Sequence, residues 1–305
     1  MNVFKLLILL LFISSPVFPQ RSAQDYFYIG NEFFKKGEYA TAIKAYSKAI
    51  EADSMNPDYY FARAIAKTYF DNYYDALPDY NKAILFDSLN PVFFYNRGHA
   101  HFDRSEFSEA FDDYYHATLI DPSVAEYFYS SGMARVKLND TKGAIEDFNS
   151  AILLDSTQKE YYLNRGLLLY AEGLKEQAME DYSEAIKIDP YYSDAVFYRG
   201  LYYHQDLKDY AAAIKDFTFL IRKNPEDYGM YLNRGNAKYD MGDYKGAIRD
   251  YSMAITSERE DGYLFYCRGL AKLAIGNLKS ACNDLQKAQF LNYEFAAEKL
   301  KEVCN

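Results

Sequence analysis

The sequence predicts an all-helical solenoid of eight helix–turn–helix repeats, and two periodic features predict it. A small residue in each expected first helix recurs at Gly30, Ala64, Gly98, Gly132, Gly166, Gly200, Gly235 and Gly269. An alanine in each expected second helix recurs at Ala42, Ala76, Ala110, Ala144, Ala178, Ala213, Ala247 and Ala281. Six of the seven steps between successive small residues are 34 residues long, and the other is 35. Self-similarity at this period is typical of stacked helical repeats that share one core.

Residues 231–255 show one whole repeat. Gly235 lies in the first helix, and Ala247 and Tyr251 lie in the second. Two helices approach closely only where one presents little bulk, so we expect Gly235 and Ala247 to form the contact between them. The ring recurs at Tyr46, Tyr80, Tyr114, Phe148, Tyr182, Phe217 and Tyr251, and Leu285 replaces it in the last repeat.

The expected turns contain residues that tolerate a left-handed backbone. Glycine fills the turn in four repeats, at Gly37, Gly173, Gly242 and Gly276. Ser105 and Asn139 take that place in two others. Such residues end one helix and permit a tight entry into the next. The sixth repeat has one extra residue, which we place within residues 204–209.

Two segments depart from the simple pattern. Pro78 falls inside the second helix of the second repeat, where it removes a backbone donor, so we expect a late or kinked helix start. Residues 293–303 are expected to form a solitary helix that covers the last apolar face. Its polar side chains are expected to face outward: Glu298, Lys299, Lys301 and Glu302.

The spacing of small residue, alanine, ring and second alanine resembles the tetratricopeptide repeat family, as do the late prolines Pro122, Pro190 and Pro225. The resemblance implies a right-handed superhelical solenoid, with eight repeats over residues 23–292 and a capping helix over residues 293–305. It also implies a concave surface lined by first helices. Proteins of this kind are non-catalytic scaffolds, so the resemblance implies a protein or peptide partner and no cofactor.

A charged pattern accompanies the apolar one. An arginine precedes the small residue in six repeats, at Arg63, Arg97, Arg165, Arg199, Arg234 and Arg268. An aspartate follows three residues after the alanine in seven repeats, at Asp79, Asp113, Asp147, Asp181, Asp216, Asp250 and Asp284. The first repeat lacks both, which indicates that each arginine pairs with the aspartate of its own repeat. Partly buried pairs of this kind set register more than they add stability.

The candidate binding site is a column of rings three residues before the small residue, together with the asparagines next to it. The proposed site residues are Tyr95, Asn96, Tyr129, Asn164, Phe197, Asn233 and Tyr266. Asparagine both donates and accepts, so it can hold the backbone of an extended peptide. The alternative is that the rings only pack between neighbouring helices, because aromatic stripes at helical spacing commonly do so.

Residues 1–22 have the layout of a secretory signal peptide. Lys5 precedes the apolar run from Leu6 to Ile13, and Ser14 and Pro16 follow. The run is too short for a spanning helix. We expect cleavage between Pro19 and Gln24 and export to the periplasm or the cell exterior. The alternative is an uncleaved membrane anchor, which would be the protein's one link to a membrane.

Three cysteines lie near the end of the chain: Cys267, Cys282 and Cys304. In an exported chain this odd count predicts one disulfide bond and one free thiol. We favour Cys282 with Cys304, and Cys267 with Cys282 is the alternative. The four histidines are far from the cysteines in sequence, so no zinc or other metal site is expected.

The formal net charge is −10, and no cluster of basic residues is present, so nucleic acid is not expected as a partner. No phosphate-binding loop, nucleophile elbow or metal-binding helix motif occurs in the sequence, and we expect no catalysis. The sequence therefore predicts an adaptor for a protein or peptide. The alternatives are a carbohydrate-binding surface, since exposed tyrosines stack on sugars, and a non-catalytic subunit of a cell-envelope complex.

Overall fold

The computed structural model describes residues 21–70, 73–256 and 261–304, and these contain seventeen α-helices and no strand. The expected signal peptide lies almost wholly outside the described residues. The chain divides into two compact units at residues 140 and 141, and each unit is described by itself. None of the described helices has the length and apolar character that crossing a bilayer requires.

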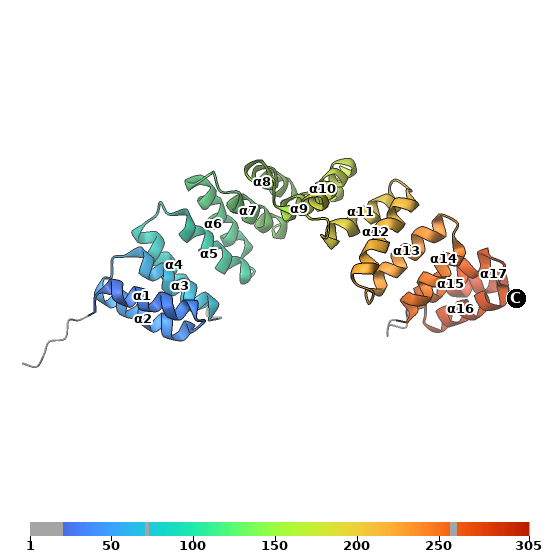
Figure 1. The fold of residues 1–305 in the computed structure, drawn as a ribbon, viewed down its shortest axis with the longest axis horizontal. Coiled ribbons are helices and arrows are strands. Elements are labelled where there is room, and N and C mark those ends of the chain that lie inside the picture. The colour runs from blue at the N-terminus through green and yellow to red at the C-terminus, as the bar shows by residue number, and fades with distance from the viewer. Residues whose placement is uncertain (1–20, 71–72, 257–260, 305) are drawn as a thin grey trace, which may run out of the picture. The chain divides into compact units, whose positions relative to one another are not determined.

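The first unit contains three complete helix pairs and one further helix (Figure 1). Its helices are α1 (Ala23–Lys35), α2 (Tyr39–Ala52), α3 (Pro57–Tyr69), α4 (Tyr73–Phe86), α5 (Pro91–Asp103), α6 (Phe107–Ile120) and α7 (Ala125–Lys137). Each helix packs on its neighbours in the chain, and α1 and α3 also touch. Odd-numbered helices are the first helices of the repeats, and even-numbered helices are the second.

The second unit continues the same alternation and ends in an unpaired helix. Its helices are α8 (Thr141–Leu154), α9 (Lys159–Ala171), α10 (Lys175–Ile188), α11 (Ser193–Gln205), α12 (Tyr210–Lys223), α13 (Tyr228–Asp240), α14 (Tyr244–Ile255), α15 (Gly262–Ala274), α16 (Leu278–Phe290) and α17 (Ala296–Cys304). Consecutive helices pack on one another here too. The all-helical fold of eight repeats and a capping helix is confirmed.

Short polar side chains begin many of these helices. Asn56 and Asn90 each accept a hydrogen bond from the backbone two residues ahead, and each precedes a proline at the first helical position. Both features satisfy or remove backbone donors that the first turn leaves unpaired. Asp243 accepts a bond from the N–H of Gly246 in the same way.

The predicted turn residues have the predicted backbone. The four turn glycines have φ between 76° and 88°, and Ser105 and Asn139 have φ of 62° and 61°. Two further left-handed residues were not predicted: Lys208, in the longer turn of the sixth repeat, and Asn292, after α16.

Two predictions about helix bounds were wrong in detail. The helix α4 starts at Tyr73, in register with Tyr39 one repeat earlier, so Pro78 does not delay it. The last helix starts at Ala296 and not at residue 293. On that helix Glu298, Lys301 and Glu302 are exposed as predicted, whereas Lys299 is half-buried.

The core is formed where the small residues meet the rings. A Cβ atom added at Gly235 would lie only 2.8 Å from Cε1 of Tyr251. Ala247 is fully buried and clusters with Tyr251 and with Ala271 of the next repeat. The two helices therefore approach closely at Gly235, but the glycine faces the ring of Tyr251, while Ala247 clusters with that ring and with the following repeat. A direct contact between Gly235 and Ala247 stays a prediction.

The predicted arginine–aspartate pairs are confirmed within both units. In each of six repeats the arginine donates from Nε and Nη2 to the two carboxylate oxygens of its own repeat's aspartate. The pairs are Arg63–Asp79, Arg97–Asp113, Arg165–Asp181, Arg199–Asp216, Arg234–Asp250 and Arg268–Asp284. The aspartates are buried, and each carboxylate forms an ion pair with its arginine.

Burial and ion pairing shift the pKa values of these groups in opposite directions. Burial raises the pKa of the Asp181 carboxyl, although the hydrogen bonds from Arg165 lower it. The same hydrogen bonds raise the pKa of Arg165. Desolvation thus offsets much of the attraction, as expected for a pair that fixes geometry more than it stabilises the fold.

Candidate functional site

The predicted aromatic column lies between first helices in the first unit. Phe27, Phe61 and Tyr95 each pack against a ring of the next first helix. The ring centroids are 5.1 Å apart for Phe27–Tyr59, 4.7 Å for Phe61–Phe93 and 4.9 Å for Tyr95–Tyr127. Burial raises the pKa of Tyr95 to about 12. These rings hold adjacent repeats together, and they present only part of their surface to solvent.

The other predicted rings are half-buried as well. Tyr129 is on α7, in the first unit. Phe197 is on α11, with its ring 5.3 Å from that of Tyr198. Tyr266 is on α15 and packs against Tyr293, with centroids 4.9 Å apart.

The three predicted asparagines lie back along their own helices. Nδ2 donates to the carbonyl four residues earlier: from Asn96 to Val92 at 2.8 Å, from Asn164 to Glu160 at 2.9 Å and from Asn233 to Gly229 at 3.0 Å. One donor of each amide is thereby used within the helix. The asparagines can therefore contribute less to a peptide than the sequence suggests.

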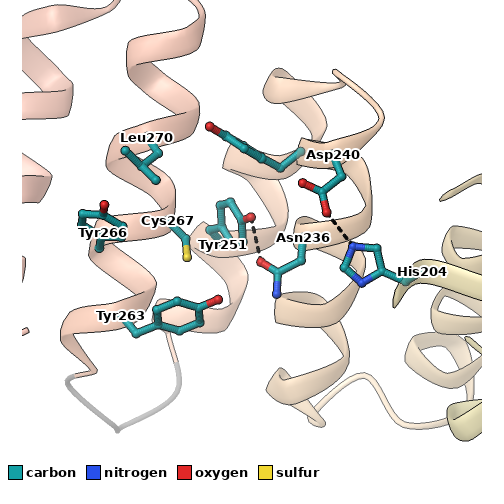
Figure 2. Close-up of a pocket in the computed structure, with 9 residues that line it drawn as sticks. His204, Asn236, Asp240, Tyr251, Tyr263, Tyr266, Cys267 and Leu270 are labelled. Carbon is teal, nitrogen blue, oxygen red and sulfur yellow. Dashed lines mark hydrogen bonds and ion pairs between the residues drawn. The ribbon is translucent and has the colours of Figure 1, made fainter. Parts of the chain in front are cut away.

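The second unit has a pocket of about 310 Å³ on the first-helix face, by which we mean the surface formed by the first helices of consecutive repeats. It is lined by His204, Asn236, Tyr239, Asp240, Tyr251, Tyr263, Tyr266, Cys267 and Leu270. Figure 2 shows these side chains converging from α11, α13, α14 and α15. We call it the tyrosine pocket.

Hydrogen bonds fix the polar groups of the tyrosine pocket. Nε2 of His204 lies 2.8 Å from Oδ2 of Asp240, which joins α11 to α13 (Figure 2). The hydroxyl of Tyr251 donates to Oδ1 of Asn236 at 2.9 Å. Burial raises the pKa of the hydroxyls of Tyr251 and Tyr263, so both stay protonated at neutral pH.

The pocket also contains the one cysteine outside the disulfide bond. Cys267 is buried, and burial raises the pKa of its thiol to about 11. A thiol in this state is a poor nucleophile, because the thiolate is the reactive form. The structure joins Cys282 to Cys304, the pairing favoured from the sequence, and so ties α17 to α16.

The first unit has pockets at corresponding places. One of about 430 Å³ lies between α3 and α5 and is lined by Ile65, Thr68, Tyr69, Tyr80, Asn96, His99 and Asp103. We call it the Asp103 pocket. Another of about 270 Å³ lies between α1 and α3, with Asn31 and Ile65 among its lining residues. In both units, therefore, open space recurs beside the residue that follows the small residue of a first helix.

The structure brings only some of the predicted site residues into these pockets. Asn96 lines the Asp103 pocket and Tyr266 lines the tyrosine pocket. Residues four or five positions after the small residue were missed: Thr68, Tyr69, Asp103, His204, Tyr239 and Asp240. A signal was available, because positions three and four apart share one helix face with the residue just after the small residue.

The described residues contain no group of three or more His, Cys, Asp and Glu side chains placed to hold a metal ion. What the pockets offer is aromatic surface, hydroxyl and amide groups, and one carboxylate each in the tyrosine and Asp103 pockets. Such walls suit binding of another molecule's side chains.

Solved structures show the same fold. The chain resembles PilF of Pseudomonas aeruginosa with a TM-score of 0.59 at 20% identity, covering 72% of this chain and 97% of that one. It resembles YrrB with a TM-score of 0.54 at 23% identity, covering 66% and 99%. It resembles MamA with a TM-score of 0.52 at 23% identity, covering 55% and 92%. No curated protein matches the sequence.

Family comparison agrees with the geometry. A model described as TPR repeat matches residues 30–68, and a model described as tetratricopeptide repeat matches residues 129–193 and 198–262. Together these segments cover more than half of the chain. With its paired helices, its 34-residue period and its glycine–ring contacts, the chain belongs to the tetratricopeptide repeat proteins.

Proposed function

We propose that this protein is a non-catalytic scaffold that binds an extended segment of a protein partner on its first-helix face. The observation that carries the proposal is the recurrence of open pockets at equivalent repeat positions in both units. Tetratricopeptide repeat proteins commonly mediate protein–protein interaction. YrrB, a structural neighbour, is described as a TPR protein with an unusual peptide-binding site.

The repeat geometry suits an extended chain. Packed helices lie about 8–10 Å apart, and an extended peptide advances about 10 Å in three residues. A segment lying across the first helices can therefore place a side chain in successive pockets at regular intervals. The half-buried rings provide apolar contact, and the amides and hydroxyls provide hydrogen bonds to its backbone.

The buried carboxylates support a non-catalytic role. The aspartates of the six described pairs are held by arginine, and Lys67, Lys238 and Lys272 reinforce three of them. A carboxylate bound on both oxygens is a structural group, because a general acid or base needs access to the proton that it transfers.

We also propose that the protein acts outside the cytoplasm. Residues 1–22 have the charge and apolar pattern of a signal peptide, and a Cys282–Cys304 bond suits an oxidising compartment. Fractionation followed by N-terminal sequencing of the mature chain tests this. A start between residues 19 and 24 in the exported fraction is expected, and an intact Met1 in the cytoplasm would contradict it.

Peptide selection tests the scaffold proposal. A random peptide display library is selected on the chain lacking residues 1–22, and the Kd of enriched peptides is measured by fluorescence anisotropy. Ile65 lines two pockets of the first unit, so Ile65→Trp should fill both and weaken peptides that bind there by at least tenfold. Leu119→Trp is the matched control, because Leu119 is exposed on the second helix α6.

Two outcomes would contradict the proposal. One is that no peptide is enriched over an unrelated helical protein. The other is that the selected peptides compete for a single site, bind Ile65→Trp as tightly as the unaltered chain, and bind Leu119→Trp more weakly.

A further inference from the structure

Two pockets, one in each unit, have a carboxylate at the same place in the repeat. Asp103 lies five residues after Gly98 in the Asp103 pocket, and Asp240 lies five residues after Gly235 in the tyrosine pocket. Both aspartates are exposed. They differ in this from the buried aspartates of the ion pairs, whose oxygens an arginine already occupies.

Aromatic rings line the same pockets as these carboxylates. The tyrosine pocket has four tyrosines: Tyr239, Tyr251, Tyr263 and Tyr266. In Figure 2 the ring of Tyr251 lies beside Asn236, and Tyr263 and Tyr266 lie on the α15 side of the pocket, across from Asp240. The Asp103 pocket has Tyr69 and Tyr80, and Tyr69 is 62% exposed. The face of an aromatic ring attracts a cation, and the attraction adds to that of a nearby carboxylate.

Among the residues that the structure describes, no lysine or arginine lines either pocket. Lys299 of α17 is within electrostatic reach of Tyr239 and Tyr266. Its ammonium group is held by both carboxylate oxygens of Glu302, at 3.0 and 2.9 Å, and so its charge is compensated. His204 binds one oxygen of Asp240, and Oδ1 of Asp240 accepts no hydrogen bond from the described residues.

We propose that the tyrosine pocket and the Asp103 pocket each accept the positively charged end of a lysine or arginine side chain of the bound segment. This inference rests on the proposed scaffold function and specifies what its partner must contain. The apolar stem of a basic side chain packs along the rings while the charged end reaches the carboxylate. The net charge of −10 favours approach of a basic segment and disfavours an acidic one.

The tyrosine pocket is tested with small probes that carry one side chain each. The chain lacking residues 1–22 is labelled with ¹⁵N and titrated with the Nα-acetyl N-methylamides of lysine, arginine and norleucine. We expect amide shifts in α11, α13 and α15, with binding of the lysine or arginine probe at least fivefold tighter than that of norleucine. The basic probe with the lower Kd identifies the preferred side chain.

Variants then locate the charge responsible. Asp240→Asn should reduce the preference for the basic probes over norleucine by at least fivefold. Asp194→Asn is the matched control, because it makes the same change at an exposed position of α11 outside the pocket. Circular dichroism checks that both variants keep the helical content and melting temperature of the unaltered chain.

Equal binding of the basic and norleucine probes would overturn the inference, as would a preference that survives Asp240→Asn. The inference and the scaffold function fail separately. If selected peptides bind but tolerate norleucine or citrulline at every basic position, the scaffold stands and the inference is wrong. If the probes bind with dependence on Asp240 but no peptide is selected, the pocket preference stands and the scaffold function is wrong.

Discussion

The first and the eighth repeats differ in what holds their two helices together. In the eighth repeat Arg268 donates to both oxygens of Asp284, at 2.9 and 2.8 Å, and its Nη1 reaches Ser252 of the seventh repeat at 3.2 Å. In the first repeat the two corresponding positions are occupied by Ile29 and Ala45. In both repeats the glycine faces a large apolar side chain of the second helix, which is the ring of Tyr46 in the first repeat and Leu285 in the eighth.

A contact with the preceding repeat accounts for the missing pair of the first repeat, and the fourth repeat departs separately, with Ser131 at the arginine position. In five of the six described pairs, Nη1 of the arginine also bonds to the second helix of the preceding repeat, at Ser47, Asn81, Asn149, Thr218 or Ser252. Within the described part of the chain no second helix precedes α1. An arginine at position 29 would lack that third partner, and an apolar pair avoids the cost of burying its charge. The arginine therefore connects the two helices of its own repeat and also bonds to the preceding repeat.

The largest expected loss of stability comes from removing one partner of such an ion pair. Asp284→Ala leaves Arg268 and Lys272 without their carboxylate, with side chains only 17% and 15% exposed. A broken buried pair costs about 3–5 kcal/mol, because the remaining charge stays desolvated. Hydrogen exchange of α15 and α16 measures the loss locally.

The double variant Arg268→Ile with Asp284→Ala places the apolar residues of the first repeat at the arginine and aspartate positions, and Lys272 remains. It should be more stable than Asp284→Ala alone, since the stranded guanidinium is gone. A double variant as unstable as the single one would show that the arginine contributes in another way.

A smaller effect is expected from opening the disulfide bond, which has no counterpart in the first repeat. Cys304→Ser frees α17 from α16 and removes a crosslink that spans 22 residues. A loop of this size is worth roughly 3 kcal/mol by the chain-entropy argument, and the loss falls on the last repeat. Faster hydrogen exchange in α17 is expected, with α1 unchanged. Dithiothreitol should reproduce the effect in the unaltered chain and have none in the variant, and equal exchange in all samples would contradict the expectation.

The next effect compares the glycine contacts at the two ends. A Cβ added at Gly30 would lie 2.4 Å from Cε1 of Tyr46, whereas one at Gly269 would lie 3.2 Å from Cγ of Leu285. Gly30→Ala should therefore destabilise by about 1–3 kcal/mol through overpacking. Gly269→Ala should change stability by less than about 1 kcal/mol, because the higher helix propensity of alanine offsets the closer contact with Leu285. Thermal unfolding of the two variants measures the order, and the reverse order would be incompatible with these contacts.

Much of the fold follows from the sequence because its signals are periodic or local. The glycine–ring spacing, the arginine–aspartate pairs and the left-handed turns each depend on residues within one repeat. The left-handed backbone of Lys208 was not predicted, because lysine seldom adopts a positive φ and its presence does not indicate such a turn. Pro78 was expected to give a late or kinked helix, and the late start was wrong, because α4 begins in register with α2.

The candidate site was harder to predict for a physical reason. A ring at the position of Tyr95 has the same period whether it packs on the next helix or faces a ligand, and only coordinates separate the two. The pockets depend on the space left between helices of different repeats. Asp240 and His204 belong to different repeats and meet only in the fold, so their pairing has no local signature.

The smallest expected effect concerns the thiol of Cys267, and it again compares the two end repeats. The equivalent position of the first repeat is Tyr28, which is 60% exposed. Burial raises the pKa of Cys267 from 9.0 to about 11, so at pH 8 about one molecule in a thousand carries the thiolate, against about one in ten for an ordinary thiol. Iodoacetamide should therefore label Cys267 at least a hundredfold more slowly than a cysteine introduced by Tyr28→Cys, with the Cys282–Cys304 bond kept oxidised. Mass spectrometry of the peptides measures both rates in one sample of the variant. Because the Cys267 thiol is buried, the rate of its labelling should rise with pH well above 9, and it should also rise on unfolding. Equal labelling rates of the two cysteines at pH 8 would mean that solvent reaches the Cys267 sulfur through the tyrosine pocket.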